Sequence, residues 1–425
     1  MMKLAVIFES SPFDRKGLFN AVHNRVKYLL ATGECIIDVF CVHSRDNAFT
    51  RRVRHTPEVP SVDETVVDGI RYRLLWYRFS ILDNVLLEKL HVRPWLFRRF
   101  MESHVDLLKG YDAVIAHSFC GGLFALAAHE RFGVPYYVTW HGSDVHTHPW
   151  RVPVILEDTR AVMESARCNF FVSRALLDAS EKIISNARKE VLYNGVSEDF
   201  VKYSLEDRAA VRERYGLAPE DKVVAFVGNI VKVKNVLSLP EIFAQVAKGY
   251  DGPLKFWIIG DGKLRKPLEA TMDLSFRPNE VSGEISFFGN QPSPAMPDIM
   301  NCIDVLVLPS LNEGLPLVCA EALSCGAAVV GSDVGGIAEV IGKDNVVPLV
   351  VPNDTDTFPG FPSGPLICTG QEMGNSGRPY DDSFVNGMTE KVVAALTGQS
   401  PFQTLPADIS WARTAALELS ILKSL

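Results

Sequence analysis

Apolar runs of strand length alternate with helix-length segments along almost the whole chain. Each run is nearly continuous in Val, Ile, Leu and Phe, which is typical of strands buried on both faces of a parallel sheet, with helices as the crossovers. The first five runs are LAVIF, CIIDVFCV, DAVIAH, YYVTW and NFFVS, and the next five are VVAFVG, FWIIG, ISFFG, DVLVLPS and AAVVGS. The pattern therefore predicts an α/β protein with two sets of parallel strands.

The length of the chain agrees with a division into two domains. A chain of 425 residues exceeds one ordinary core, so two domains of about 200 residues each are expected. We place a first Rossmann-like domain at residues 1–200, completed by a C-terminal helix at about 408–425, and a second one at 215–400. The charged segment 196–220 between the two sets of strands is the expected hinge.

A second irregular segment, at about 352–382, is crowded with Gly and Pro and has no hydrophobic period. Such a composition predicts a long loop. Helical patterns follow at about Ser383–Leu396 and again from Trp411 onwards.

Composition and cysteine usage exclude several protein classes. The hydrophobic share of 47% and the charged share of 22% are those of a soluble globular protein, and they exclude disordered, collagen-like and coiled-coil chains. The eight cysteines, from Cys35 to Cys368, contain no C-x-x-C pair. We therefore expect reduced, buried thiols rather than a disulfide scaffold or a zinc ribbon.

The opening segment MMKLAVIFES is predicted to be a strand. It lacks the basic start, long apolar run and small-residue cleavage site of a signal peptide. No run in the chain approaches the roughly 20 apolar residues that span a bilayer. We therefore expect a cytoplasmic protein.

Two glutamates mark the most informative block, PSLNEGLPLVCAEALSCGAAVVGSDVGG. Glu313 lies in a loop directly after a predicted strand, and Glu321 lies about two turns along the following helix, so both can face one ligand. Gly314 permits a close backbone approach, and Pro316 suits a first helical turn. Because ligands of open parallel sheets bind beyond the carboxyl ends of the strands, at helix N-termini, this block is the predicted binding site.

This block resembles the Glu, seven residues, Glu motif of the retaining nucleotide-sugar glycosyltransferases of glycosyltransferase family 4. The segments LYNGVSEDF, TWHGSD, VGNIVKVKN and IIGDG resemble further motifs of that family in the same order, over about residues 3–350. The resemblance implies the GT-B fold, with two Rossmann-like parallel-sheet domains facing across a cleft. It implies that the first domain binds the acceptor, that the second binds the donor, and that the final helix packs back on the first.

The resemblance also implies a donor site in the second domain. Glu321 would bind the donor ribose, and Glu313 would contact the sugar. The loop of Gly314, Leu315 and Pro316 would help to hold the sugar and the diphosphate. Lys234 would neutralise the charge that develops on the leaving phosphate.

Two positions depart from the family pattern. The family usually has Arg where this chain has Asn229, so phosphate stabilisation would rest more on Lys234 or on Lys232. Gly17, which follows Lys16, is the one glycine left where the family has a glycine loop that approaches the donor.

Three residues of the first domain complete the expected site. His141 corresponds to the family's histidine near the reacting sugar, so the catalytic set is His141, Lys234 and Glu313. Asp144 would orient His141 or contact the acceptor. His117, at the end of DAVIAH, either contacts the acceptor or packs in the core.

The mechanism implied by the family is front-face substitution with retention, in which the donor's own phosphate takes the acceptor's proton. We therefore expect a hexosyl- or related sugar transferase that uses a UDP- or GDP-sugar and needs no cofactor and no metal. The acceptor would be a glycan or a lipid-linked glycan of surface polysaccharide or glycolipid synthesis. Asp354 and Asp356 are assigned to a solvated loop, and His146 and His148 lack further plausible ligands.

Positive charge is concentrated near the N-terminus. The first 110 residues carry a net charge of +4 and the remainder −12. Within 70–100, seven Lys and Arg oppose Asp83 and Glu88, with six Trp, Tyr and Phe interleaved between 76 and 100. This mixture fits a peripheral contact with the inner face of a membrane, or aromatic core residues with a solvated basic face. Nucleic acid is excluded because the surplus is local.

Two other functions use similar domains. A dehydrogenase that binds NAD would have G-x-G-x-x-G after the first strand of a domain, which neither domain has. A nucleotide-sugar-binding protein without transferase activity would not need both Lys234 and Glu313.

Overall fold

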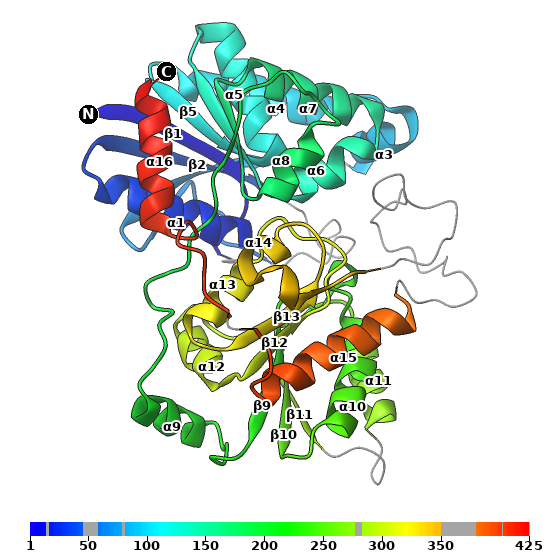
Figure 1. Ribbon diagram of the computed structural model, residues 1–425. Coiled ribbons are helices and arrows are strands. Elements are labelled where there is room, and N and C mark those ends of the chain that lie inside the picture. Colours follow the sequence, from blue (N-terminus) through cyan, green and yellow to red (C-terminus); the bar gives the residue numbers. More distant parts are fainter. Residues whose placement is uncertain are drawn as a thin grey trace. The chain divides into compact units, whose positions relative to one another are not determined.

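The computed structural model (Figure 1) describes the following residues: 1–13, 17–45, 58–78, 81–276, 283–349, 380–401 and 403–424. They form two compact units. The first unit contains residues 1–194 and 411–424, and the second contains 195–349 and 380–410. Each unit is described by itself. Most of the loop expected at 352–382, including Asp354 and Asp356, lies outside the described residues.

The first unit contains an eight-stranded sheet with the order β3-β4-β2-β1-β5-β6-β7-β8. Its strands are β1 (Met2–Glu9), β2 (Cys35–Ser44), β3 (Glu64–Val67), β4 (Ile70–Tyr77), β5 (Ala113–His117), β6 (Tyr136–Trp140), β7 (Cys168–Phe171) and β8 (Lys189–Val191). Neighbouring strands are parallel except for β3 and β4, which form an antiparallel hairpin at one edge. The five apolar runs of the sequence become β1, β2, β5, β6 and β7.

The hairpin at the edge was not predicted. Its turn is Asp68-Gly69, and both residues have a positive φ, 50° and 80°. Asp-Gly is the usual sequence of a type I′ turn, which joins two antiparallel strands. Strand β4 lies within the basic aromatic segment 70–100. Two of its side chains, Tyr72 and Leu74, are nevertheless buried in the core of the unit.

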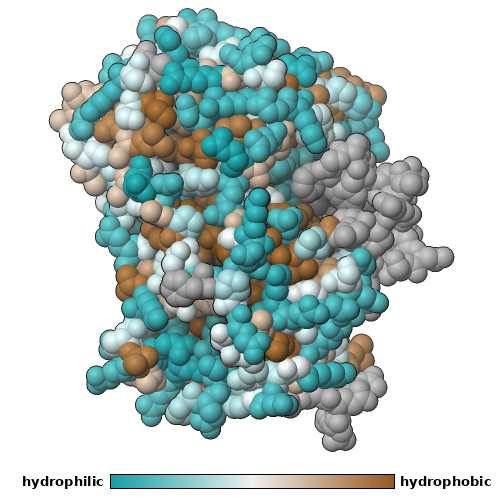
Figure 2. All heavy atoms as spheres, viewed as in Figure 1, coloured by the Kyte–Doolittle hydropathy of each residue, from teal (hydrophilic) through white to brown (hydrophobic). Residues whose placement is uncertain are grey.

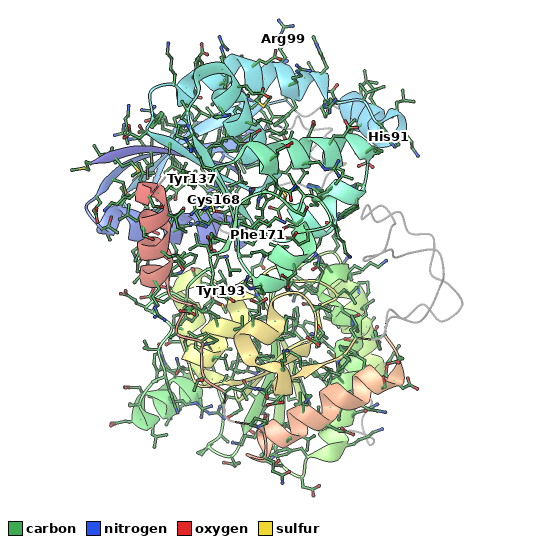
Figure 3. The ribbon with its side chains drawn as sticks, turned by 45° about the horizontal axis from the view of Figure 1, so that its top comes forward. His91, Arg99, Tyr137, Cys168, Phe171 and Tyr193 are labelled. Atoms are coloured by element: carbon green, nitrogen blue, oxygen red, sulfur yellow. The ribbon has the colours of Figure 1, made fainter. Side chains whose placement is uncertain are left out.

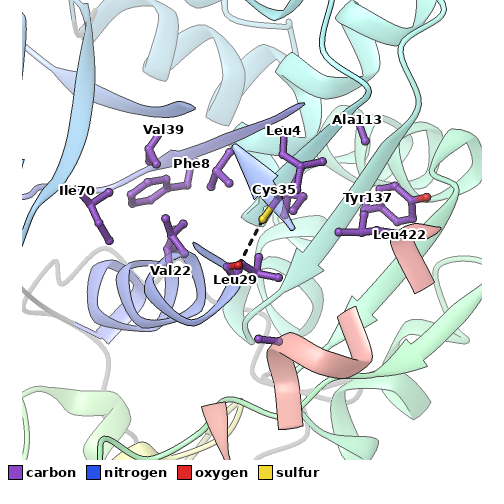
Figure 4. Packing of buried hydrophobic residues seen from close by; sticks show 14 of the residues in the cluster. Leu4, Phe8, Val22, Leu29, Cys35, Val39, Ile70, Ala113, Tyr137 and Leu422 are labelled. Atoms are coloured by element: carbon purple, nitrogen blue, oxygen red, sulfur yellow. Dashed lines mark hydrogen bonds between the residues drawn. The ribbon is translucent and has the colours of Figure 1, made fainter. Parts of the chain in front are cut away.

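Helices cover both faces of this sheet. They are α1 (Gly17–Ala31), α3 (Ile81–Leu90), α4 (Trp95–His104), α5 (Ser118–Phe132), α6 (Ser143–His146), α7 (Pro153–Ser165), α8 (Arg174–Ser180) and α16 (Trp411–Ser424). Figure 4 shows Val22 of α1 close to Phe8 of β1, and Leu29 of α1 close to Cys35 of β2, whose Sγ donates to the carbonyl of Leu29 at 3.3 Å. Helix α5 lies close to β1, because a Cβ atom added to Gly121 would lie 2.4 Å from the carbonyl oxygen of Ile7.

The last helix packs on the first unit, beside α1 (Figure 1). Arg25 of α1 donates from Nε to Oε2 of Glu418 in α16 at 2.6 Å, and neither side chain is more than 1% exposed. Thr414 donates from its hydroxyl to the carbonyl of Tyr193 at 2.6 Å. Tyr193 lies after β8, which is the edge strand next to β7. Figure 3 labels it together with Tyr137 of β6 and with Cys168 and Phe171 of β7.

The second unit contains a six-stranded sheet with the order β11-β10-β9-β12-β13-β14, in which the paired strands are parallel. Its strands are β9 (Lys222–Val227), β10 (Leu254–Ile259), β11 (Glu284–Gly289), β12 (Val305–Leu308), β13 (Ala328–Ser332) and β14 (Val346–Val347). Its helices are α9 (Leu205–Arg214), α10 (Leu239–Gly249), α11 (Arg265–Ser275), α12 (Met296–Cys302), α13 (Leu317–Ser324), α14 (Ile337–Ile341) and α15 (Asp382–Leu396). The predicted fold class, α/β with two Rossmann-like parallel-sheet domains, is confirmed.

The segment 196–220, where we expected a hinge, is fastened to the second unit over much of its length. The side chain of Asn301 in α12 accepts from the backbone N–H of Tyr203 at 2.9 Å and donates to the carbonyl of Val201 at 3.0 Å. Arg212 of α9 is buried and donates to the carbonyl of Cys302 at 2.6 Å. These contacts make α9 part of the second unit.

No helix in the described ranges combines the length and the apolar character that crossing a bilayer requires.

Candidate active site

Loops at the carboxyl ends of the parallel strands carry the predicted residues of the second unit. Asn229 and Lys234 follow β9, and Glu313 follows β12 in the loop that continues into α13. Strands β9 and β12 are neighbours in the sheet, so their carboxyl ends lie side by side. This is the edge at which open parallel sheets bind ligands.

Lys234 and Glu313 are in direct contact. Nζ of Lys234 donates to Oε1 of Glu313 at 2.5 Å, and the two side chains are 20% and 11% exposed. The hydroxyl of Ser310 donates to the same oxygen at 2.6 Å. The N–H of Leu311 donates to the carbonyl of Val233 at 2.8 Å and ties the two loops together. The sequence therefore brings a cation and a carboxylate together at a partly buried point of the edge.

The Gly-x-Gly segment after β10 has a packing role. A Cβ atom on Gly260, whose φ is +126°, would lie 2.0 Å from the carbonyl oxygen of Gly228. A Cβ atom on Gly262 would lie 2.3 Å from the carbonyl oxygen of Ile230. The N–H of Ile230 donates to the carbonyl of Asp261 at 3.0 Å. The two glycines thus let the loop after β10 press against the loop that leads to Lys234.

Gly335, which the sequence analysis did not single out, supports the Glu313 loop from β13. Its φ is +52°, and a Cβ atom there would lie 1.8 Å from the carbonyl oxygen of Glu313. The N–H of Gly336 donates to the carbonyl of Gly314 at 3.1 Å. The Gly-Gly pair after AAVVGS was the available signal, since adjacent glycines mark close backbone approach or a special turn.

Glu321 lies on α13 and is partly buried. Burial raises the pKa of its carboxyl group to about 7. Among the described residues its carboxylate has no hydrogen-bond partner, so its acceptor atoms remain available to a ligand. Desolvation of a charged carboxylate is costly unless hydrogen-bond donors compensate it.

The start of α13 supplies backbone donors. Gly314 and Leu315 precede the helix, and Pro316 is the residue before its first turn. Within the described part of the chain, the N–H groups of Gly314 and Leu315 are not used in hydrogen bonds. Free amides at a helix N-terminus favour an anion. Asn229 and Lys232 are both exposed.

A pair of histidines lies at the carboxyl ends of β5 and β6 in the first unit. Nδ1 of His117 and Nε2 of His141 are 3.1 Å apart. Burial, and then the positive charge of Arg25, lower the pKa of His141 to about 3. Burial, Arg25 and His141 lower the pKa of His117 well below its ordinary value. Both rings are therefore neutral near pH 7, and one ring N–H lies between them.

Asp144 holds the backbone after β6. Its carboxylate accepts from the N–H of His141 at 3.1 Å and from the N–H of Gly142 at 2.8 Å. The side chain is buried, which raises its pKa, while these bonds and one with Ser118 act in the opposite direction. Ser118 has a left-handed φ of 62°, which is strained for a residue with a Cβ atom. The contacts of Asp144 orient the turn that carries His141.

The remaining predicted positions are placed as follows. Gly17 is the first residue of α1, and open space surrounds the position of a Cβ atom there. Lys16 lies outside the described residues. Gly17, His117, His141 and Asp144 belong to the first unit, whereas the other predicted site residues belong to the second, namely Asn229, Lys234, Glu313, Gly314, Leu315, Pro316 and Glu321. Over the described ranges, no cluster of three or more His, Cys, Asp or Glu has the arrangement of a metal site.

Comparisons with known proteins assign each unit to a family. The "Glycosyl transferase 4-like domain" matches residues 27–195, and "Glycosyl transferases group 1" matches residues 221–359. TuaC of Bacillus subtilis (strain 168), provisionally named as a teichuronic acid biosynthesis glycosyltransferase, is 29% identical over 233 residues, which are 55% of this chain and 56% of TuaC. The chain thus spans little more than half the length of this curated relative.

Solved structures share the fold. The sucrose-phosphate synthase of Thermosynechococcus elongatus has a TM-score of 0.67 at 16% identity, with 100% of this chain and 95% of that chain covered. HepE of Anabaena, in complex with UDP and glucose, has a TM-score of 0.62 at 16% identity, with 100% of both chains covered. These neighbours are GT-B glycosyltransferases, so the predicted GT-B class is confirmed. With both units matched by glycosyltransferase family models, the chain belongs to the group 1 glycosyltransferases of the family 4 type.

Proposed function

We propose that the protein is a retaining glycosyltransferase that moves a sugar from a UDP- or GDP-sugar to a glycan or lipid-linked glycan. The observation that carries the proposal is the contact between Lys234 and Glu313 at the carboxyl edge of the second sheet. Glu321, on the helix that follows, is partly buried, and its carboxylate accepts no hydrogen bond from the described residues. Cation, carboxylates and free amides together suit a ligand that combines a diphosphate with hydroxyl groups.

The second unit would bind the donor. Hydroxyl groups of the ribose would donate to Glu321, which compensates its desolvation. Hydroxyl groups of the transferred sugar would donate to Glu313, and the amides of Gly314 and Leu315 would face the diphosphate. Lys234 would lie beside the leaving phosphate, where a preorganised cation stabilises developing negative charge. Asn229 offers no charge there, so more of the stabilisation of the phosphate's negative charge comes from Lys234.

The first unit would bind the acceptor, with His117, His141 and Asp144 near the reacting groups. In front-face substitution the bond between the anomeric carbon and the diphosphate oxygen breaks. A bond forms between that carbon and the acceptor oxygen on the same face, and the acceptor's proton passes to the diphosphate oxygen. The neutral histidines are suited to hydrogen bonding rather than to charge neutralisation.

The names of similar proteins support the substrate classes. TuaC is named for teichuronic acid biosynthesis, and HepE was solved with UDP and glucose. A role in surface polysaccharide or glycolipid synthesis, with a UDP-sugar as donor, follows as part of this proposal.

We also propose that α3 and α4 contact the inner face of a membrane, where lipid-linked acceptors are found. Most aromatic residues of 70–100 are packed: Tyr77, Phe97 and Phe100 form ring contacts with one another, and Phe97 and Phe100 also contact Phe124. Helices α3 and α4, with the residues between them, also carry side chains that are not packed. Six large apolar side chains are exposed there within fifteen positions: Leu82, Val85, Leu90, Val92, Trp95 and Leu96.

Figure 2 shows hydrophobic residues at the surface where α3 lies, and Figure 3 shows Arg99 of α4 at the periphery. Trp95 is 61% exposed, and the guanidinium of Arg99 lies 5.6 Å from the centre of its ring. Aromatic and cationic side chains together favour an interface with anionic lipid. Co-sedimentation with anionic vesicles at low salt tests the contact, and its loss in Trp95→Ser with Leu96→Ser is the expected result. A wild-type protein that stays in the supernatant contradicts it.

Titration with UDP, GDP and NAD tests the proposed function against its alternatives. The proposal predicts saturable binding of UDP or GDP and none of NAD. Saturable NAD binding without UDP or GDP binding would establish a Rossmann-type NAD-dependent enzyme instead. Nucleotide-sugar binding without hydrolysis or transfer would establish a binding protein.

A further inference from the structure

We propose that Ser310 is a positioning residue for Glu313, and that it determines how well the protein recognises the sugar of its donor. The inference rests on the proposed function, since it assigns Glu313 to the sugar. Ser310 follows β12 and is fully buried. It therefore acts through Glu313 and does not touch the donor.

Both hydrogen bonds to the Glu313 carboxylate reach one oxygen. Oε1 accepts from Nζ of Lys234 at 2.5 Å and from the hydroxyl of Ser310 at 2.6 Å. Within the described part of the chain, Oε2 accepts no hydrogen bond. One oxygen is thus committed to the protein, and the other remains available to sugar hydroxyls.

The two donors to Oε1 differ in what they can do. Lys234 is part of a long, flexible side chain, and in the proposed reaction its charge is drawn to the phosphate. The hydroxyl of Ser310 is on a short side chain whose backbone is part of the sheet edge. Ser310 therefore keeps the carboxylate in place when the lysine turns to the diphosphate.

A second layer of contacts holds Ser310 itself. The hydroxyl of Ser332, the last residue of β13, donates to the carbonyl of Ser310 at 2.5 Å, and Ser332 is fully buried. Gly335 packs against the carbonyl of Glu313. The chain from Ser332 through Ser310 to Glu313 is therefore fixed by the neighbouring strand before any ligand binds, as preorganisation of a binding site requires.

The consequence is a separation between nucleotide and sugar recognition. Without the hydroxyl of Ser310, Glu313 keeps Lys234 as its partner and can follow the ammonium toward the phosphate. The sugar then loses a fixed acceptor, whereas Glu321 and the amides of Gly314 and Leu315 keep their hold on the nucleotide. A variant at Ser310 should therefore lose affinity for the sugar nucleotide but not for the nucleoside diphosphate.

Calorimetric titration of Ser310→Ala tests this inference. UDP-glucose, UDP-N-acetylglucosamine and GDP-mannose are each compared with UDP or GDP, and turnover is measured with the sugar nucleotide that the wild type binds. The Kd of that sugar nucleotide should rise about tenfold, at the lower end of what a hydrogen bond to a charged group contributes. The Kd of UDP or GDP should change less than twofold, and Ser310→Thr, which keeps a hydroxyl, should recover most of the loss.

The control is Ser180→Ala. Ser180 is equally buried and donates to the carbonyl of Leu177 at 2.6 Å in α8 of the first unit. Its variant should keep every Kd. Wild-type Kd values in Ser310→Ala, or equal losses for UDP-glucose and UDP, overturn the positioning role alone. A wild-type protein that binds none of the three sugar nucleotides overturns the proposed function as well.

Discussion

Nζ of Lys234 lies 2.5 Å from Oε1 of Glu313, although 79 positions separate the two residues in sequence. They meet because each follows one of two neighbouring parallel strands, β9 and β12. The pair is partly exposed, so a ligand can reach it from the edge of the sheet. In the proposed reaction the diphosphate becomes a second partner of the lysine, and Glu313 remains to hold the sugar.

Replacing Lys234 by alanine should chiefly slow transfer. A fixed charge or donor that stabilises the developing negative charge contributes about 10² to 10³ in kcat, and Asn229 cannot replace the charge. We expect kcat to fall about 100-fold or more, with a smaller change in donor Kd. Steady-state kinetics with calorimetry measure both. Lys248→Ala, at an exposed position in the last turn of α10, is the matched control. Unchanged kcat in Lys234→Ala would show that Lys234 takes no part in the chemical step.

The raised pKa of Glu321 predicts a pH-dependent affinity for the donor. Its carboxyl group titrates near pH 7 in the free protein, against an ordinary value of 4.5. Ribose hydroxyls donate more strongly to the ionised form. Affinity for a UDP-sugar, whose phosphates do not titrate there, should therefore increase from pH 5.5 to pH 7.5 and then level off. Glu321→Gln should bind more weakly and lose this dependence, and the same slope in both proteins would contradict the assignment.

The same pKa predicts how Glu321 affects stability. Because the folded pKa lies above the unfolded one, the folded state binds more protons between about pH 4.5 and pH 7, and this group's contribution to stability falls as the pH rises through that window. Glu321→Gln, which stays neutral, should therefore become more stable relative to the wild type from pH 5 to pH 8. Urea unfolding at both pH values measures the difference, and a constant difference would contradict the prediction.

Gly335→Ala should displace Glu313. The added Cβ atom would lie 1.8 Å from the carbonyl oxygen of Glu313, so the loop must move. We expect Gly335→Ala to lose more sugar-nucleotide affinity and more transfer activity than a Gly→Ala change at a left-handed φ causes by itself. Gly398→Ala separates the two effects, since Gly398 has a similar φ of +71° with open space around it. Equal, small effects of both substitutions on sugar-nucleotide affinity would show that the contact with Glu313 is unimportant.

The buried pair of Arg25 and Glu418 should govern the attachment of α16. Removing one partner leaves an uncompensated buried charge, which costs about 3 to 5 kcal/mol. Arg25→Ala should lower the free energy of unfolding of the first unit by about that amount, and Arg25→Met with Glu418→Leu should recover much of it. The pair of Arg98 and Glu102 is the contrast, because both side chains are mostly exposed. Its removal should cost less than about 1 kcal/mol, and similar losses at both pairs would refute the distinction.

Much of the fold follows from local patterns in the sequence. Ten apolar runs became ten strands, because strands inside a parallel sheet are covered on both faces and are apolar over most of their length. The edge strand β11 is the exception, since its sequence is apolar although none of its residues is fully buried. The strands β3, β8 and β14 were missed since they lie at or near sheet edges, where fewer apolar positions are required. Strand β4 was missed because its basic residues, such as Arg73, interrupt the continuous apolar run by which the other strands were predicted, although Asp68-Gly69 signalled a hairpin turn.

The candidate site was less accessible to sequence reasoning. The block from Glu313 to Glu321 could be recognised because its spacing along one loop and one helix is a local property. The roles of Ser310, Ser332 and Gly335 could not, because each depends on a contact between segments that only the folded sheet brings together. The pairing of His117 with His141 is of the same kind.

Mass spectrometry of the purified protein with a panel of UDP- and GDP-sugars tests the central claim, that Lys234 and Glu313 serve glycosyl transfer. At least one sugar nucleotide should be converted to nucleoside diphosphate and free sugar, and NMR should show that the sugar is released with the anomeric configuration of the donor. Conversion should fall at least 100-fold in Lys234→Ala. A panel that stays intact, or equal conversion by wild type and Lys234→Ala, would contradict the claim.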